Sequence, residues 1–329
     1  MSSRRKGCVT ALIVIGALFV LLIIASLIGG ALVGDSVSQE KYQEITLLEG
    51  SGGKIARIDV EGVISSEVDR AGQSMVSRFK EQVTQALSDK EVKAIVLHVN
   101  SPGGGVTASD TMYQAVAEAR QKKPVVVYMN SVAASGGYYI ACAANQIVAN
   151  ETTITGSIGV IIQTFGFQGL LNSIGLELRT FKSGQNKDLL NGARDLTEEE
   201  KAIVQNLVNE SYDKFVSIVA EGRGIEPATL REGIADGRIF SGRQAFQNKL
   251  VDQLGYVETA YQVARELGKA PEAEVIRYQE SFGLGALLSL LGKAPAMESE
   301  NKIEIDVAER LLPNLQPGQM YFLPAYYLR

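Results

Sequence analysis

Short apolar segments that alternate with amphipathic helices constrain the fold of this chain more than any other sequence feature. Residues 94–99 (AIVLHV) and 125–129 (VVVYM) are apolar runs of strand length, and a turn of small residues follows each of them. Apolar side chains recur at helical spacing in residues 75–88, before the first run, and in residues 107–120, between the two. Strands that alternate with helices predict an α/β fold with a largely parallel sheet and flanking helices.

Three further segments extend this α/β pattern. Residues 54–64 (KIARIDVEGVI) alternate apolar and polar side chains and are predicted to form a strand, and residues 146–149 resemble another short strand. The sequence Thr197-Glu198-Glu199-Glu200 has the spacing of a capping box and predicts the start of a long helix that runs toward Gly222. The segment 236–255 is expected to close the main domain.

The N-terminal region has the pattern of a membrane anchor. Residues 7–34 contain no charged residue, and three basic residues precede them at 4–6. The run exceeds the apolar core of about 7–15 residues in a cleaved signal peptide, so we expect a retained transmembrane anchor at 8–33. The positive-inside rule keeps the basic tip, residues 1–7, cytoplasmic and predicts a single-pass protein of the cell membrane with an extracytoplasmic catalytic domain. Small residues at 29–31 leave cleavage open as an alternative.

The rest of the chain divides into three predicted parts. Residues 34–53 are polar, end in glycines and are expected to form a flexible tether. Residues 54–270 form the main domain, and residues 271–329 form a C-terminal extension with an apolar segment at 281–291. The tail, residues 320–329 (MYFLPAYYLR), is aromatic and apolar. One hypothesis places it as a plug in a groove, its own or a neighbour's, and the alternative is docking on the domain surface.

Composition excludes several classes of function. The net charge of −5 gives no indication of a nucleic-acid partner. The two cysteines, Cys8 at the edge of the anchor and Cys142 in the main domain, cannot readily pair, so no internal disulfide is expected and Cys142 is predicted to be a core residue. The single histidine, His98, and the lack of a cysteine cluster make a zinc site improbable, and no cofactor is predicted.

A serine in a turn of small residues is the leading candidate nucleophile. Ser135 lies in AASGGYY, directly after the predicted strand at 125–129. A strand–turn–helix placement of this kind exposes a hydroxyl, and the amide of Gly136 and the helix dipole would then face a developing oxyanion. The alternative is a tight turn that only caps a helix.

The glycine-rich sequence NSPGGG at 100–105 supports the catalytic interpretation, because it also follows an apolar strand. Successive glycines let the backbone approach a substrate, and their amides can stabilise an oxyanion or bind a phosphate. The phosphate alternative is weak, because the chain lacks the P-loop pattern and the dinucleotide fingerprint.

A serine nucleophile needs a base, and the chain offers few candidates. His98 lies within a predicted strand between apolar neighbours, where a lone histidine is more often structural. The sequence FKSGQNKD at 181–188 offers Lys182 and Lys187 instead. A lysine base must be neutral, which requires burial because a free lysine has a pKa near about 10.4. The spacing does not choose between the two lysines.

Taken together, the motifs NSPGGGV, SVAASGGYYIACAA, TGSIGV, KSGQNKD and DGRIFSGRQAFQNKLVDQLG resemble the signal peptide peptidase A family in its short, single-domain bacterial form. The resemblance covers roughly residues 54–260 and implies a Clp-protease/crotonase-like fold. It implies that Ser135 is the nucleophile and Lys187 the general base, that Ser157 orients the lysine, and that Gly136 and Gly104 provide the oxyanion amides.

The resemblance also implies substrates and an assembly. A protein of this family is expected to degrade cleaved signal peptides and similar apolar peptides at the membrane. The short members are expected to form rings of eight subunits in which the serine and the lysine come from adjacent protomers, and the segment 281–291 would suit such an assembly. The alternatives are a crotonase-like acyl-CoA enzyme, which needs no serine nucleophile, and an inactive membrane scaffold of the same fold.

Overall fold

The computed structural model describes residues 42–69, 72–280 and 320–322, together with Gly16 and residues 20–21. Apart from those three positions, the predicted anchor at 8–33 lies outside the described residues, as does the apolar segment 281–291. Within the described part of the chain, no helix is both long and apolar enough to cross a bilayer. The chain divides into two compact units, and the elements below belong almost entirely to the larger one, residues 44–279 with 293–329.

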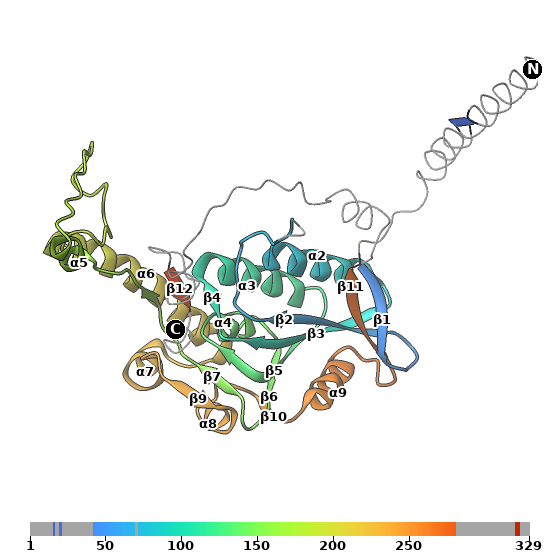
Figure 1. The fold of residues 1–329 in the computed structure, drawn as a ribbon. Helices are drawn as coiled ribbons and strands as arrows, with labels where there is room; N and C mark the ends of the chain where they lie inside the picture. Colours follow the sequence, from blue (N-terminus) through green and yellow to red (C-terminus); the bar gives the residue numbers. More distant parts are fainter. Residues whose placement is uncertain (1–15, 17–19, 22–41, 70–71, 281–319, 323–329) are drawn as a thin grey trace, which may run out of the picture. The chain divides into compact units, whose positions relative to one another are not determined.

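A largely parallel sheet forms the centre of the domain (Figure 1). Its strands follow the order β1-β11-β2-β3-β5-β6-β10, and every pair from β11 to β10 is parallel. The strands are β1 (Tyr42–Leu48), β2 (Lys54–Glu61), β3 (Val92–Ser101), β5 (Val125–Ala134), β6 (Gln146–Ala149), β10 (Gln253–Leu254) and β11 (Glu274–Glu280). This arrangement confirms the predicted mixed α/β class.

Five short strands extend the structure beside the candidate site. β7 (Ile154–Gly156) pairs in parallel with the end of β5 and antiparallel with β9 (Ile239–Ser241). A separate three-stranded sheet has the order β4-β12-β8 and contains β4 (Gly104–Gly105), β12 (Met320–Phe322) and β8 (Ile161–Ile162). The glycine-rich sequence and the tail therefore belong to one small sheet.

Helices cover both faces of the main sheet. Figure 1 shows α2 (Met75–Ser88) and α3 (Val106–Arg120) on one face and α9 (Val257–Leu267) on the other. The core beneath α9 is apolar and contains Val96, Tyr128 and Val275 packed against Tyr261. The remaining helices are α4 (Gly136–Ala141), α5 (Gln168–Ser173), α6 (Glu198–Arg223), α7 (Pro227–Thr229), the π-helical turn η1 (Leu230–Ile234) and α8 (Gly242–Gln247).

Local sequence signals set the ends of the long helices. The hydroxyl of Ser74 accepts a hydrogen bond from the amide of Ser77 at the start of α2. Thr197 and Glu200 form the predicted capping box at the start of α6, and the helix ends at Gly224, whose φ of 62° suits glycine. The predicted long helix is therefore confirmed.

Two strands correct the predicted division of the chain. Residues 42–48 were expected in the flexible tether but form β1, and residues 274–280 were expected in the C-terminal extension but form β11, which pairs with β2. Most side chains of β1 are exposed, so its sequence does not need the apolar alternation that identifies a half-buried strand. The predicted strand at 54–64 ends at Glu61, and Ile64 instead forms an isolated bridge with Gly104.

Cys142 lies directly after α4 and is buried, as predicted. Burial raises the pKa of its thiol to about 12, so the side chain is neutral at physiological pH. A β-carbon at Gly222 of α6 would lie 2.4 Å from the Cys142 carbonyl oxygen, so this pair of residues lets α6 pack closely against the end of α4.

Candidate active site

Ser135 lies in a sharp turn between β5 and α4. Its backbone has φ 53° and ψ −113°, a conformation that residues with side chains rarely adopt. The Ser135 amide donates a hydrogen bond of 2.8 Å to the Gly156 carbonyl, and the Tyr139 amide donates to the Ser135 carbonyl. The residue is 1% exposed, and its Oγ has no hydrogen-bond partner among the described residues. The fold therefore holds a buried hydroxyl in a strained turn, without a base from the described part of its own chain.

The glycine-rich loop is held in place from two sides. The buried hydroxyl of Ser101 donates a hydrogen bond of 2.6 Å to the Gly62 carbonyl and accepts one from the Gly103 amide. Ile64 donates to the Gly103 carbonyl and accepts from the Gly105 amide, at 2.8 and 2.9 Å. These contacts hold the loop backbone in place on both sides of Gly104.

The loop and the serine turn meet at their glycines. A β-carbon at Gly103 would lie 2.5 Å from the Gly136 amide nitrogen, and a β-carbon at Gly136 would lie 3.1 Å from the Gly104 amide nitrogen. The first distance is shorter than a real β-carbon makes, so this approach requires glycine at 103, and the second is a tight contact that a β-carbon could make only if its neighbour shifted. The two predicted oxyanion amides, of Gly136 and Gly104, therefore lie close together beside Ser135.

Ser157 lies next to Ser135 because of the strand register. Ala134 of β5 pairs with Gly156 of β7 in a parallel ladder, so Ser135 and Ser157 leave neighbouring strands at the same level. Ser157 also has a positive φ, 49°, and its amide donates to the Arg238 carbonyl. The structure thus brings together four of the five predicted site residues, which are Ser135, Gly136, Gly104 and Ser157.

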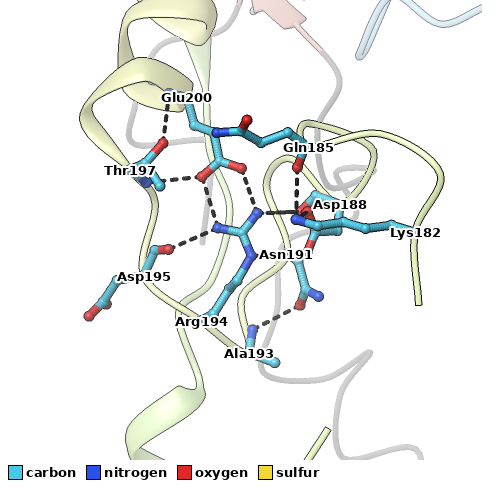
Figure 2. A network of polar contacts seen from close by, with 9 residues as sticks. All are labelled: Lys182, Gln185, Asp188, Asn191, Ala193, Arg194, Asp195, Thr197 and Glu200. Carbon is cyan, nitrogen blue, oxygen red and sulfur yellow. Dashed lines mark hydrogen bonds and ion pairs between the residues drawn. The ribbon is translucent and has the colours of Figure 1, made fainter. Parts of the chain in front are cut away.

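The two candidate lysines have different surroundings. The ammonium of Lys182 lies 2.7 Å from Asp188 Oδ1 and 2.7 Å from the Gln185 carbonyl oxygen (Figure 2). Lys187 is exposed, and its ammonium makes no hydrogen bond or ion pair within the residues that the structure describes. No hydrogen bond joins either lysine to Ser135 in the described part of a single chain. Lys182 is engaged by a carboxylate, whereas Lys187 is available to a partner.

Comparison with known proteins provides the decisive observation on the family. Residues 117–270 match the model of peptidase family S49, and residues 63–168 match that of the NfeD1b N-terminal domain. A protein of Enterococcus faecium, named as a signal peptide peptidase SppA, is 38% identical over 293 residues, which cover 85% of this chain and 84% of that protein. The chain belongs to the signal peptide peptidase A family.

Longer proteins also resemble this member of the signal peptide peptidase A family. Protease 4 of Salmonella typhi is 35% identical over 255 residues, and the chloroplastic serine protease SPPA of Arabidopsis thaliana is 34% identical over 250 residues. The alignments cover about three quarters of this chain but only 41% and 36% of those two proteins. The shared region is a peptidase domain, and this family member is a peptidase.

A network of charges links the loop that carries Lys182 and Lys187 to α6 (Figure 2). Arg194 lies between two carboxylates: its Nη2 is 2.7 Å from Asp188 Oδ1, and its Nη1 is 2.8 Å from Glu200 Oε2. The hydrogen bond from Arg194, and then that from the Thr197 amide, lowers the pKa of Glu200 to about 2. The hydrogen bond from Arg194, and as the second largest cause that from Lys182, lowers the pKa of Asp188. Asp188, Arg194 and Glu200 therefore remain charged at neutral pH.

Sequence reasoning missed this network, although part of its signal is visible. Asp188 directly follows Lys187, and Glu200 is the acidic residue of the capping box. The box accounts for the hydrogen bond from the Thr197 amide to Glu200 Oε2, but it does not indicate that Arg194 contacts both oxygens of Glu200. Charged residues on a loop usually face solvent, so the sequence could not predict that these side chains form ion pairs with one another.

His98 has a structural position in the sheet. It pairs with Asp59 of β2 and Tyr128 of β5, and its ring lies 5.4 Å from the Tyr128 ring. The Nδ1 atom of His98 is 3.6 Å from Asp59 Oδ1. Burial of the ring, and then the positive charge of Arg57, lowers the pKa of His98. None of these contacts involves Ser135, which agrees with the structural interpretation of the lone histidine.

The tail lies beside the glycine loop. Residues 320–322 form β12 between β4 and β8, and Phe322 is 1% exposed. A β-carbon at Gly103 would lie 2.0 Å from the Phe322 carbonyl oxygen, so the tail backbone directly contacts the loop. Residues 323–329 lie outside the described residues, and their predicted role as a plug stays a prediction.

Proposed function

We propose that this protein is a membrane-anchored serine endopeptidase with a Ser135–Lys187 dyad, and that it degrades cleaved signal peptides and similar apolar peptides at the membrane. The observation that carries the proposal is the buried Ser135 hydroxyl in a strained turn, beside the closely spaced amide nitrogens of Gly136 and Gly104. Such a turn gives a nucleophile and two oxyanion donors in one place.

Each residue of the proposed site has a defined step. Lys187, as a neutral amine, takes the proton of the Ser135 hydroxyl while Oγ attacks the substrate carbonyl carbon. The amides of Gly136 and Gly104 stabilise the negative oxygen of the tetrahedral intermediate. The peptide C–N bond then breaks, and Lys187 gives the proton to the leaving amine. Water next attacks the acyl-enzyme: Lys187 takes a proton from the water and gives it to Ser135 Oγ as the ester bond breaks. Ser157 orients the amine by a hydrogen bond.

The proposal places Lys187 of one subunit at Ser135 of the next. Ser135 Oγ and the Lys187 ammonium both lack a polar partner within the described part of one chain. The segment before Lys187 also exposes many large apolar side chains, which a monomer would leave in water. They are Phe165, Phe167, Leu170, Ile174, Leu176, Leu178 and Phe181, the last 96% exposed. A ring of eight subunits, as the family resemblance implies, would cover them and exclude water from the lysine.

The anchor and the location follow from the sequence alone. The uncharged run at 7–34 and the basic residues before it support a single-pass protein of the cell membrane with its peptidase domain outside the cytoplasm. An anchored site near the bilayer would meet apolar peptides that remain in the membrane after their release from preproteins.

Covalent labelling tests the proposal directly. A serine-directed acylating probe, followed by mass mapping, should modify Ser135 in the solubilised full-length protein, and Lys187→Ala should greatly slow this labelling. Ser135→Ala should abolish peptide cleavage while the protein still assembles. Cleavage by Ser135→Ala would overturn the assignment. A wild type that resists the probe and cleaves no peptide would favour the acyl-CoA enzyme or the inactive scaffold.

A further inference from the structure

We infer that Ser109 is a positioning residue of this peptidase: its buried hydroxyl oxygen supports Gly136 from the side of α3 and so maintains the spacing of the two oxyanion amides. The inference rests on the proposed function, in which the amides of Gly136 and Gly104 stabilise the negative oxygen of the tetrahedral intermediate. It adds a residue that lies on α3, beyond the end of the motif NSPGGGV.

The Ser109 side chain is buried without a polar partner. The residue is 0% exposed, and its Oγ makes no hydrogen bond within the described part of the chain. Burial of an unpaired hydroxyl lowers the stability of the folded state, and native proteins keep few such groups. The hydroxyl of Ser135, the proposed nucleophile, is buried and unpaired in the same way. An unpaired hydroxyl at Ser109 therefore suggests a role other than stability.

The Ser109 hydroxyl also makes no use of a partner in its own helix. Serine and threonine in helices commonly donate a hydrogen bond to the carbonyl one turn earlier. Thr111, on the same helix, does so, at 2.8 Å from the Thr107 carbonyl oxygen. The corresponding carbonyl for Ser109 is that of Gly105, but the Ser109 hydroxyl does not bond to it. The side chain is directed instead at the turn that follows Ser135.

The contact of Ser109 with this turn is a close one. A β-carbon on Gly136 would lie 2.4 Å from Ser109 Oγ, and 3.1 Å from both the Gly103 Cα and the Gly104 amide nitrogen. The φ of Gly136 is not positive, so the backbone conformation alone would accept a side chain. Lack of space is therefore the reason for glycine at 136, and Ser109 Oγ is the nearest of the atoms that take up this space.

Ser109 and the glycine-rich loop belong to one continuous piece of the chain. α3 begins directly after Gly104 and Gly105, and its first turns carry Ser109. The buried side chains of Met112 and Val116 hold this helix in the domain. Because an oxyanion hole depends on donors that are in place before the charge develops, the contact of Ser109 with the serine turn would keep one donor at a set distance from the other.

The variant Ser109→Ala tests the inference in the solubilised full-length protein. It removes the oxygen that contacts Gly136 and keeps the β-carbon. On a short apolar peptide we expect kcat to fall at least about tenfold and KM to change less than about twofold, because the displaced amide acts on the transition state. The Tm should stay the same or rise, since an unpaired buried hydroxyl is lost. An unchanged kcat, or a fall in kcat together with Tm, would overturn the inference.

A second substitution tests the contact itself. In Gly136→Ala the new methyl group would lie too close to Ser109 Oγ, and we expect a loss of kcat of at least about a hundredfold. The double variant Ser109→Ala/Gly136→Ala should exceed Gly136→Ala by at least about tenfold, because removal of the oxygen leaves space for the methyl group. The change at 109 would then be harmful in the wild type and beneficial in Gly136→Ala. Losses that simply multiply in the double variant would overturn the inference.

Ser217→Ala is the matched control. It makes the same chemical change on α6, at an exposed hydroxyl that donates a hydrogen bond of 2.9 Å to the Asp213 carbonyl. This variant should keep the kcat and the Tm of the wild type. Full activity of Ser109→Ala would refute the role of Ser109 alone, whereas peptide cleavage by Ser135→Ala would refute the proposed function, so the two failures are distinguishable.

Discussion

Ser135 adopts backbone angles that cost about 1–3 kcal/mol for a residue with a side chain. The surrounding turn compensates for this strain through the hydrogen bonds to Gly156 and from Tyr139. The strain is useful at this position, because an ordinary helical or extended serine would not combine a nucleophilic Oγ in a sharp turn with the amide of the following residue as an oxyanion donor. Among the described serines, Ser135 and Ser157 have a positive φ, so backbone conformation, more than residue type, sets these two apart from the others.

Gly103 should be among the residues of the loop least tolerant of substitution. In Gly103→Ala, the new β-carbon would lie too close to the Gly136 amide nitrogen, and the backbone φ of 103° disfavours any side chain. The Gly136 amide must then move, and we expect kcat/KM to fall at least about a hundredfold, the effect of losing one oxyanion donor. Steady-state kinetics on an apolar peptide would measure the loss.

The control for this substitution is Gly233→Ala. A β-carbon at Gly233 would have no heavy atom within 4 Å, and its φ is not positive. This variant should retain the activity of the wild type. Equal activities for the two variants would show that the contact between the loop and the serine turn does not matter for catalysis.

At the scale of single elements, the loop that carries Lys187 depends on Arg194. Arg194→Ala would remove the link between Asp188 and Glu200 and free the loop from the start of α6. We expect at least a tenfold loss of kcat/KM with little change in Tm, because the network orders one loop and not the core. Hydrogen exchange of the amides at 186–196 should become faster. Arg243→Ala, which breaks the exposed ion pair with Glu151, is the matched control and should leave activity and exchange at 186–196 unchanged.

The same network predicts the behaviour of the loop in acid. The pKa of Glu200 is lowered from 4.5 to about 2, and that of Asp188 is lowered as well. A carboxylate with a lowered pKa stabilises the folded loop fully above its unfolded pKa, and this stabilisation is lost as the pH falls through the folded value. Protection of the loop amides should therefore decline between about pH 4.5 and 2 in the wild type. If the loop amides of Arg194→Ala lost their protection over the same pH range as the wild type, the charge network would not be the cause of this transition.

The tail strand β12 should reduce the activity of the full-length protein. Truncation after Pro317 removes the strand that pairs with β4 and β8, so the edges of both strands become available to a peptide. We expect a higher rate on a short apolar peptide, and the separate tail peptide should inhibit the truncated protein by competition. An unchanged rate would show that residues 320–322 only cover the surface.

Sequence patterns predicted the elements with buried faces better than those at the edges. α2 and β6 have the predicted bounds, and α3 begins one residue before its predicted start, because each repeats apolar side chains at a fixed spacing. β1 was missed, because most of its side chains are exposed, and the pairing of β11 with β2 joins segments more than 200 residues apart. No local pattern reports such a pairing.

The candidate site was predictable only in part. Ser135 and Gly136 were predicted from the turn of small residues, and Gly104 and Ser157 from the family motifs. The strand register brings Ser157 to Ser135, and the close approach of the glycines brings Gly104 to Gly136. The choice of Lys187 over Lys182 depended on resemblance, since both lie in one short loop. The contact of Asp188 with Lys182 supplies a physical reason that the sequence could not show, because side chains six residues apart in a loop have no fixed spacing.

At the scale of the whole molecule, a site shared between subunits makes a clear prediction. Ser135→Ala and Lys187→Ala should each be inactive alone, but assemblies that contain both should regain activity, because one subunit then supplies the serine and its neighbour the lysine. Co-expression with two different affinity tags would isolate the mixed assemblies. Mixing Ser135→Ala with the double variant Ser135→Ala/Lys187→Ala should restore nothing, and a mixture of the single variants that stays inactive would place the dyad within one chain.

The position of β11 also has a consequence for biogenesis. This strand comes from the end of the main domain, yet it lies between β1 and β2, which come from its beginning. A nascent chain that has not yet emerged past residue 280 leaves the hydrogen-bonding edge of β2 open, and such an edge can pair with other unfolded chains. Synthesis must therefore be nearly finished before the sheet closes, which would delay the appearance of proteolytic activity until the whole domain has been made.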